Sequence, residues 1–162
     1  MSQDEKNPSQ ERTRRVLFID LGNTCRSPMA KVILEEKLKM ANLEPMILVD
    51  SAGVEPSQPE ASQGARTAMV SLFGVDLLES HRTKKLTREL VDWADLILAM
   101  EIRHEVGLPP EKTVTLSEYA GIRGEIEDPY GGNEQAYEKC GRTIANCIDR
   151  AFSRIVRAAE VP

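Results

Sequence analysis

The chain has 162 residues, of which 41% are hydrophobic and 29% charged, a composition typical of one soluble globular domain. Its formal net charge of −5 comes without any basic block, which argues against nonspecific binding to nucleic acid. No apolar run approaches the roughly 20 residues that cross a bilayer, so no membrane partner is expected.

Residues 1–14 are polar and are predicted to form a disordered tail, followed by a single domain over residues 15–160. Three cysteines in a chain without an export pattern predict reduced thiols and a cytoplasmic location. Cys140 and Cys147 are two helical turns apart, or about 10.5 Å by rise, which is too far for a disulfide within one helix. We therefore expect both to be core residues.

Four short apolar runs predict buried strands at residues 16–19, 46–49, 96–100 and 113–116. Apolar residues at helical spacing predict the helices between and after them: Met29, Ile33, Leu34 and Leu38; Ala65, Met69 and Leu72, ended by Gly74; Leu86, Leu90 and Trp93; and Tyr137, Cys140, Ile144, Cys147, Ile148 and Ile155. This alternation predicts an α/β fold of three layers, with a four-stranded parallel sheet and helices on both faces.

The segment RVLFIDLGNTCRSPMAKVI, residues 15–33, reads as a strand, a small polar loop and a helix. Ligands of parallel sheets bind beyond the carboxyl ends of the strands, where this loop is expected. Gly22 and Asn23 tolerate left-handed backbone geometry, so successive amides can point inward and bind an anion. Ser27 is predicted to be the N-cap and Pro28 the first helical residue, with the positive helix end facing the anion. The alternative is an ordinary strand-to-helix turn with an exposed Arg26, while a dinucleotide-binding loop would need a glycine triplet that is absent.

Taken together, the loop DLGNTCRSP resembles the low-molecular-weight protein-tyrosine phosphatase family, whose signature is a cysteine, five residues and then arginine-serine. Further segments match in the expected order: DSAGV at residues 50–54, HRTKKLT from His81, ADLILAM before residue 101, and EDPYGG at residues 127–132. The resemblance covers the chain after Arg15 and implies the same four-stranded parallel fold.

The resemblance implies a role for each matching residue. Arg26 and the loop residues would bind the phosphoryl group, and Asp128 would be the general acid and base. The implied phosphate-binding set is Leu21, Gly22, Asn23, Thr24, Cys25, Arg26 and Ser27, supported by a polar network that includes Ser51 and His81. No metal or cofactor is expected. For His81 a plain surface or capping role stays open, and Asp128 is also compatible with an ordinary Asp-Pro turn.

Asp20 stands where the resemblance places the nucleophilic cysteine. A carboxylate matches a thiolate in charge, but it is a weaker nucleophile and its oxygens can fold back onto the loop amides. We therefore expect a protein that binds phosphate but has lost most hydrolysis. Three alternatives stay open. The first is an aspartyl-phosphate mechanism, since VLFIDLGNT half-resembles the haloacid-dehalogenase motif, although Gly22 stands in place of the second acid. The others are a reactive Cys25 thiol activated by Arg26, and an engineered variant of an active enzyme.

Thr24 indicates the substrate, because threonine at this position resembles the bacterial protein-arginine phosphatase branch of the family. The branch resemblance implies that Thr24 narrows the pocket, that Asp128 recognises the guanidinium and that Tyr130 forms one wall. Glu55 would lie near the mouth. The expected ligands are a protein carrying phosphotyrosine or phosphoarginine, or inorganic phosphate.

Overall fold

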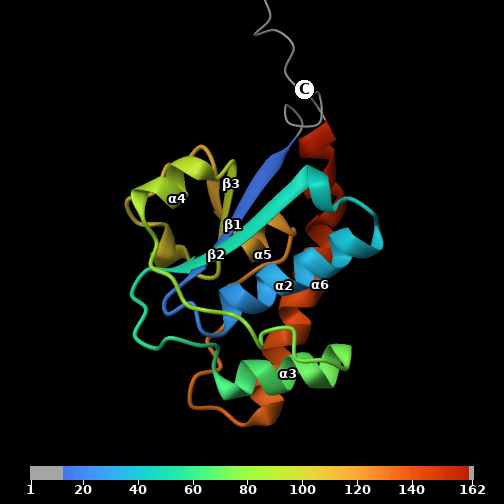
Figure 1. Cartoon of the computed structure of the whole chain (residues 1–162). Coiled ribbons are helices and arrows are strands. Elements are labelled where there is room, and N and C mark those ends of the chain that lie inside the picture. Colours follow the sequence, from blue (N-terminus) through green and yellow to red (C-terminus); the bar gives the residue numbers. More distant parts are fainter. Residues whose placement is uncertain (1–12, 161–162) are drawn as a thin grey trace, which may run out of the picture.

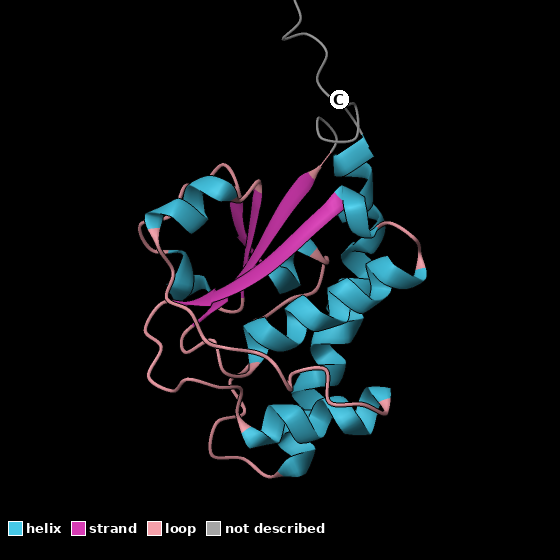
Figure 2. Cartoon of the chain, in the orientation of Figure 1, coloured by secondary structure: helices cyan, strands magenta, loops and turns pink. Residues whose placement is uncertain are grey.

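The computed structural model describes residues 13–160, so the tail predicted over residues 1–14 lies almost wholly outside it. Four parallel strands form one sheet in the order β2-β1-β3-β4 (Figures 1 and 2). Their bounds are β1 Arg14–Asp20, β2 Ile47–Gly53, β3 Leu96–Ala99 and β4 Thr113–Thr115. The predicted parallel sheet is confirmed.

Helices cover both faces of this sheet. The described α-helices are α2 Arg26–Met40, α3 Gln63–Phe73, α4 Arg88–Trp93, α5 Leu116–Tyr119 and α6 Glu134–Glu160, with short 3-10 turns η2 Glu44–Met46 and η3 Ile102–Glu105. Helix α4 lies on one side of the sheet, and α2 and α6 lie on the other (Figure 1). Every helix in this part of the chain falls short of what a membrane span requires.

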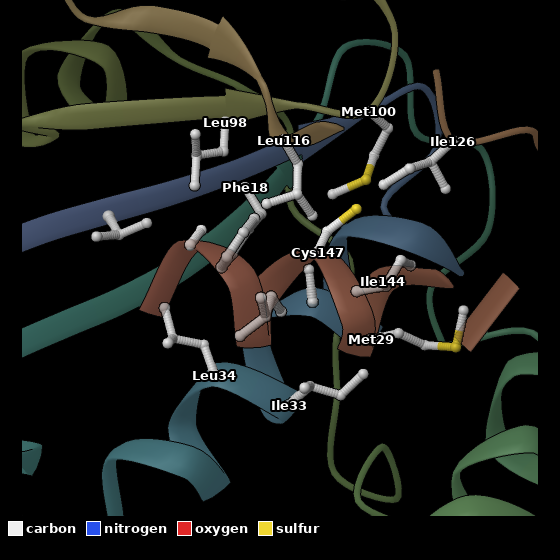
Figure 3. Packing of buried hydrophobic residues seen from close by; sticks show 14 of the residues in the cluster. Phe18, Met29, Ile33, Leu34, Leu98, Met100, Leu116, Ile126, Ile144 and Cys147 are labelled. Atoms are coloured by element: carbon white, nitrogen blue, oxygen red, sulfur yellow. The ribbon is translucent and has the colours of Figure 1, made fainter. Parts of the chain in front are cut away.

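Alternate residues of β1 point to two separate hydrophobic clusters, as the period of a strand requires. Val16 and Phe18 belong to the larger cluster, with α2 and α6, whereas Leu17 and Ile19 belong to the smaller one, next to α4. The predicted stripe of α2 and that of α6 from Cys140 onward are buried in the larger cluster (Figure 3). The central strand β1 therefore packs apolar side chains on both faces of the sheet, and its one acidic residue, Asp20, lies at its carboxyl end.

Element boundaries differ from the sequence prediction at several places. Strand β1 is longer than predicted at both ends, Met100 follows β3 instead of ending it, and Leu86 precedes α4 instead of lying in it. Met46 ends the 3-10 turn η2 instead of opening β2, and β2 continues through Asp50 to Gly53, which the prediction placed after the strand. Leu116 begins α5 instead of ending β4, because the Thr115 hydroxyl caps that helix by accepting from the Glu118 amide. Short apolar runs do not distinguish the last residue of a strand from the first of a helix.

Candidate functional site

The loop between β1 and α2 lies at the carboxyl end of β1 and is supported by the segment that follows β2. The Val54 amide donates to the Asp20 carbonyl at 2.9 Å, and the Glu55 amide donates to the Leu21 carbonyl at 2.7 Å. Gly53 lies so close that a Cβ there would be 2.9 Å from the Asn23 nitrogen. The end of β2 therefore fixes the path of the loop.

Asn23 is the centre of a polar network behind the loop. Its φ of 57° is left-handed, whereas Gly22, for which the same geometry was predicted, does not adopt it. The Asn23 side-chain amide donates to Ser27 Oγ at 2.9 Å and to Ser51 Oγ at 3.0 Å. His81 Nε2 donates to the Asn23 carbonyl at 2.8 Å, and burial lowers the pKa of this imidazole. The structure thus brings together the predicted supporting residues.

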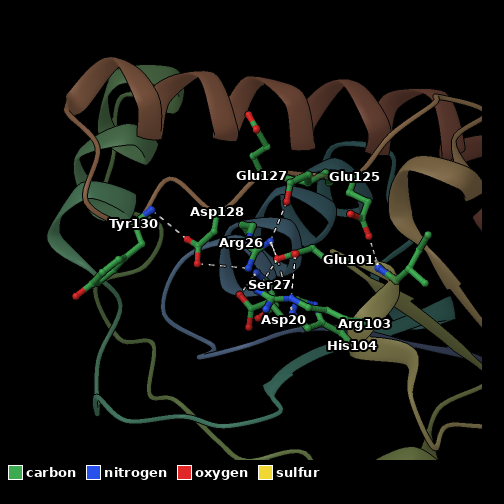
Figure 4. A network of polar contacts seen from close by, with 12 residues as sticks. Asp20, Arg26, Ser27, Glu101, Arg103, His104, Glu125, Glu127, Asp128 and Tyr130 are labelled. Carbon is green, nitrogen blue, oxygen red and sulfur yellow. Dashed lines mark hydrogen bonds and ion pairs between the residues drawn. The ribbon is translucent and has the colours of Figure 1, made fainter.

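The Asp20 carboxylate accepts hydrogen bonds from two backbone amides of the loop, and Figure 4 shows Asp20 beside one of the two donors, Ser27. Oδ1 accepts from the Asn23 amide at 2.7 Å and Oδ2 from the Ser27 amide at 2.9 Å, and the side chain is almost wholly buried. Burial raises the pKa of this carboxyl, although hydrogen bonds from Ser27 and Asn23 and the charge of Arg26 oppose the shift. The carboxylate therefore folds back onto the loop, as expected.

This geometry makes the predicted helix start wrong. Cys25, not Ser27, precedes the first turn of α2, and its side chain makes no capping bond. Ser27 lies inside the helix, where its amide donates to Asp20. The Asp20 carboxylate, at the end of β1, therefore takes the place of a local capping side chain. The Ser27 amide in the first turn has no acceptor within the helix, and a carboxylate accepts its hydrogen bond more strongly than a hydroxyl does.

Three further loop amides remain as donors for a ligand. Within residues 13–160, the N–H groups of Gly22, Thr24 and Cys25 donate to no protein acceptor. They lie beside the N-terminus of α2, a helix of 15 residues whose dipole favours a negative charge there. Backbone donors and a helix end together form the kind of site that binds oxyanions.

Arg26 is buried and is held by acceptors from two other parts of the chain (Figure 4). Nη1 donates to Glu101 Oε2 at 2.6 Å and to the Ile126 carbonyl at 2.8 Å. Nη2 lies 3.6 Å from Asp128 Oδ2, so the two residues predicted for phosphate binding and acid catalysis are neighbours. The exposed-arginine alternative is therefore wrong.

Sequence reasoning missed Glu101 and His104, which flank Arg26. Burial would raise the pKa of Glu101, but hydrogen bonds from Arg26 and Arg103 outweigh it, and the pKa is lowered. His104 is buried, its ring nitrogens have no hydrogen-bond partner in the described chain, and Nε2 lies 3.8 Å from Glu101 Oε2. Burial lowers the pKa of His104. The one available signal was position, because both residues follow β3 at the same sheet edge as the loop.

Cys25 is buried, and its surroundings disfavour the hypothesis of an activated thiol. Its interaction with the Cys140 thiol, together with burial, raises the pKa of Cys25 well above its usual range. The hypothesis relied on Arg26, whose guanidinium is instead directed to Glu101 and Asp128. Cys140 and Cys147 are buried, as predicted, and all three cysteines are free.

A cavity of about 780 Å³ has Asp128 and Tyr130 in its wall, together with Glu101, and no residue of the loop lines it. Tyr130 is 88% exposed and its amide donates to Asp128 Oδ1 at 3.1 Å. Thr24 and Glu55, the other residues predicted for the substrate pocket, do not line this cavity. Of the three residues predicted for the substrate pocket, Tyr130 is therefore the one that lines this cavity together with Asp128.

Gly53 provides a test of how tightly the loop is packed. Gly53→Ala is expected to lower the free energy of unfolding by about 1–3 kcal/mol, because the new methyl would overlap loop backbone atoms at 2.9 Å. Chemical denaturation measures the change. Gly22→Ala is the matched control, since its Cβ would meet nothing nearer than Thr24 Oγ1 at 3.7 Å. Equal losses in the two variants would contradict the close approach.

Comparison with known proteins places this geometry in context. A family model described as "Low molecular weight phosphotyrosine protein phosphatase" matches residues 15–160. The protein-arginine-phosphatase of Geobacillus stearothermophilus is 36% identical over 148 residues, which cover 87% of this chain and 95% of the relative.

Two solved structures are also similar to this chain. The low molecular weight protein tyrosine phosphatase from T. tengcongensis has a TM-score of 0.80 and 35% identity, covering 88% of this chain and 99% of that one. A cysteine-to-serine mutant of the YwlE arginine phosphatase, described as having a phosphorylated active site serine, has a TM-score of 0.77 and 32% identity. The alignment covers 86% of this chain and 94% of the mutant.

Proposed function

The chain belongs to the low molecular weight phosphotyrosine protein phosphatase family, and we propose that it binds phosphorylated protein side chains but hydrolyses them poorly. The proposal rests on one observation: Asp20, a buried carboxylate, stands at the position where the family signature has its cysteine nucleophile. The partner is a phosphorylated protein or inorganic phosphate. The location we infer is cytoplasmic, which the three free cysteines support.

Phosphate binding follows from the donors around the loop. The amides of Gly22, Thr24 and Cys25 would bind phosphoryl oxygens, and the α2 dipole would favour their charge. Arg26 would contribute through Nη2, whose contact to Asp128 is the longer of its ion pairs. Because these groups are held by burial and by partners outside the loop, the site is preorganised for an anion.

Hydrolysis would be impaired at the first step, attack on phosphorus. A carboxylate oxygen is a poorer nucleophile than a thiolate, and both oxygens of Asp20 are already bonded to loop amides. Asp128, 3.6 Å from Arg26, would protonate the leaving group, so the proposed impairment concerns the nucleophile and not the acid.

We further propose that the protein recognises phosphoarginine in preference to phosphotyrosine. This preference is supported by the 36% identity to a protein-arginine-phosphatase and by Thr24. The carboxylate of Asp128 at the cavity wall would face a guanidinium more favourably than a phenyl ring.

Calorimetric titration with three versions of one peptide tests binding. Peptides carrying phosphoarginine or phosphotyrosine are expected to bind, the first more tightly, and inorganic phosphate should compete with both. Hydrogen bonds to charged groups contribute about 1.5–3 kcal/mol each, so the unmodified peptide should bind at least about tenfold more weakly. Equal affinity for the modified and unmodified peptides would reject the proposal.

A second candidate is a working phosphatase that uses Asp20 as its nucleophile. The solved arginine phosphatase mutant with a phosphorylated active site serine favours it, since an oxygen nucleophile is phosphorylated there. An Asp20 oxygen would attack phosphorus, the leaving group would depart with the Asp128 proton, and water would hydrolyse the acyl phosphate. Accumulation of a hydroxylamine-sensitive phosphoprotein during turnover would support this route. An engineered replacement of cysteine in an active enzyme is compatible with the same site.

A further inference from the structure

The candidate site has more negative than positive charge. The carboxylates of Asp20, Glu101 and Asp128 lie around a single buried cation, the Arg26 guanidinium. Arg103 also contacts Glu101, at 3.0 Å, but its side chain is 63% exposed and its charge is largely screened by solvent. With all three carboxylates ionised, a phosphoryl dianion would enter a site that is already negative.

Asp20 is the carboxylate that an entering anion would meet. Its two oxygens accept from amides at 2.7 and 2.9 Å, on the same loop whose remaining amides are the donors for a ligand. Solvent cannot screen a repulsion between the two anions, because the Asp20 side chain is only 3% exposed. Like charges in a shared, buried site do not both stay ionised.

We propose that this loop binds a doubly charged oxyanion only together with one proton, which Asp20 takes up. The ligand then meets a neutral carboxylic acid, whose hydroxyl donates a hydrogen bond to it, in place of a second anion. The inference rests on the proposed phosphate-binding function, because it concerns the same loop. Burial already raises the pKa of Asp20, which reduces the free energy needed to protonate it.

Other titratable or charged groups also face Asp20 from the elements packed around it. They are Cys25 and Arg26 at the start of α2, His81 before α4, Glu101 and His104 after β3, and Asp128 before α6. Arg26 is already charged and the Cys25 thiol already holds its proton, since its pKa is raised, so neither takes up another.

Geometry disfavours the alternatives. Glu101 is bound by two guanidinium groups, which stabilise its ionised form. The His81 nitrogen that contacts Asn23 already carries a proton, and a positive charge at buried His104 would have no hydrogen-bonded acceptor in the described chain, since Glu101 Oε2 is 3.8 Å away. Asp128 is 38% exposed, so water helps to stabilise its charge. Of the three carboxylates, Asp20 is the one that is almost wholly buried and bonded to the amides of the loop itself.

Isothermal titration calorimetry with sulfate measures the coupled proton. Sulfate stays doubly charged between about pH 5 and 8, so any proton uptake belongs to the protein, and two buffers of different ionisation enthalpy count it. We expect uptake to approach one proton per sulfate toward the upper end of this range. The Kd should then rise about tenfold per pH unit, as linkage of one proton to one anion requires.

Two matched carboxylate-to-amide variants locate the proton. In Asp20→Asn, which is neutral at every pH, proton uptake should disappear and the Kd should become nearly independent of pH. In Asp128→Asn, uptake should persist. Binding of sulfate to the unmodified protein without proton uptake would overturn the inference, and so would uptake that survives in Asp20→Asn but is lost in Asp128→Asn.

The outcomes also separate this inference from the proposed function. Sulfate binding without a coupled proton rejects the inference and leaves the phosphate site in place. Failure of both the unmodified protein and Asp20→Asn to bind sulfate rejects the site itself. If Asp20→Asn does not fold, infrared difference spectra of the unmodified protein give the answer: sulfate should produce a protonated carboxyl band, and its absence on binding would overturn the inference.

Discussion

Asp20→Cys is expected to raise kcat/KM for an aryl phosphate or a phosphoarginine substrate by about 10³-fold, equivalent to about 4 kcal/mol in the barrier. The rest of the site already fits a thiolate. The amides of Asn23 and Ser27, which now bind the carboxylate, would stabilise a negative sulfur in the same place. Asn23 Nδ2 donates to Ser27 Oγ, so the serine hydroxyl can donate to the nucleophile.

Steady-state hydrolysis by the two proteins measures this effect. Asp20→Asn is the control, since it removes the carboxylate without adding a nucleophile and should gain no activity. If Asp20→Cys is no faster than the unmodified protein, the explanation by a missing thiolate is wrong. Rapid turnover by the unmodified protein, particularly with a requirement for Mg²⁺, would instead favour the aspartyl-phosphate route.

The second large effect is expected at Arg26. In an Asp20→Cys background, Arg26→Lys should lower kcat/KM by about 10²- to 10³-fold, the range for loss of one preorganised charge-stabilising donor. Lysine keeps the charge but cannot contact Glu101, the Ile126 carbonyl and a phosphoryl oxygen together, as the guanidinium fork can. The free energy of unfolding should fall by about 1–3 kcal/mol, because buried acceptors lose a partner.

Arg103→Lys is the matched control for this experiment. Arg103 contacts the same Glu101 carboxylate, but its side chain is 63% exposed. We expect a change of less than about 1 kcal/mol in stability, as for other exposed ion pairs, and kcat/KM within a few-fold of the parent. If Arg26→Lys and Arg103→Lys have similar activity, the guanidinium of Arg26 does not stabilise the transferring phosphoryl group.

Local sequence patterns predicted most of the fold. The strands follow from short apolar runs, and the buried faces of α2 and α6 follow from helical spacing, because burial of apolar surface acts on each element separately. The same reasoning placed the loop of residues 21–25 beyond the end of β1, and matching motifs identified the family. These features depend on neighbours in the chain.

The contacts of the loop depended on the tertiary structure. Glu101 is 75 residues from Arg26 and Ile126 is 100 residues away, and they meet because β3 pairs with β1 and ends at the same sheet edge. Ser27 has the residue type of a cap, yet Asp20 accepts its amide from the neighbouring strand. Cys25 lies beside a charged residue in sequence but against Cys140 in space.

The sequence by itself thus determined the sheet, the position of the loop and the carboxylate at residue 20. Only the tertiary structure decided which amides that carboxylate bonds, which carboxylates surround Arg26 and how little solvent reaches them. The physical reason is that secondary structure reflects local periodicity and burial, whereas charge balance and hydrogen bonding in a buried site depend on groups that the sheet order brings together.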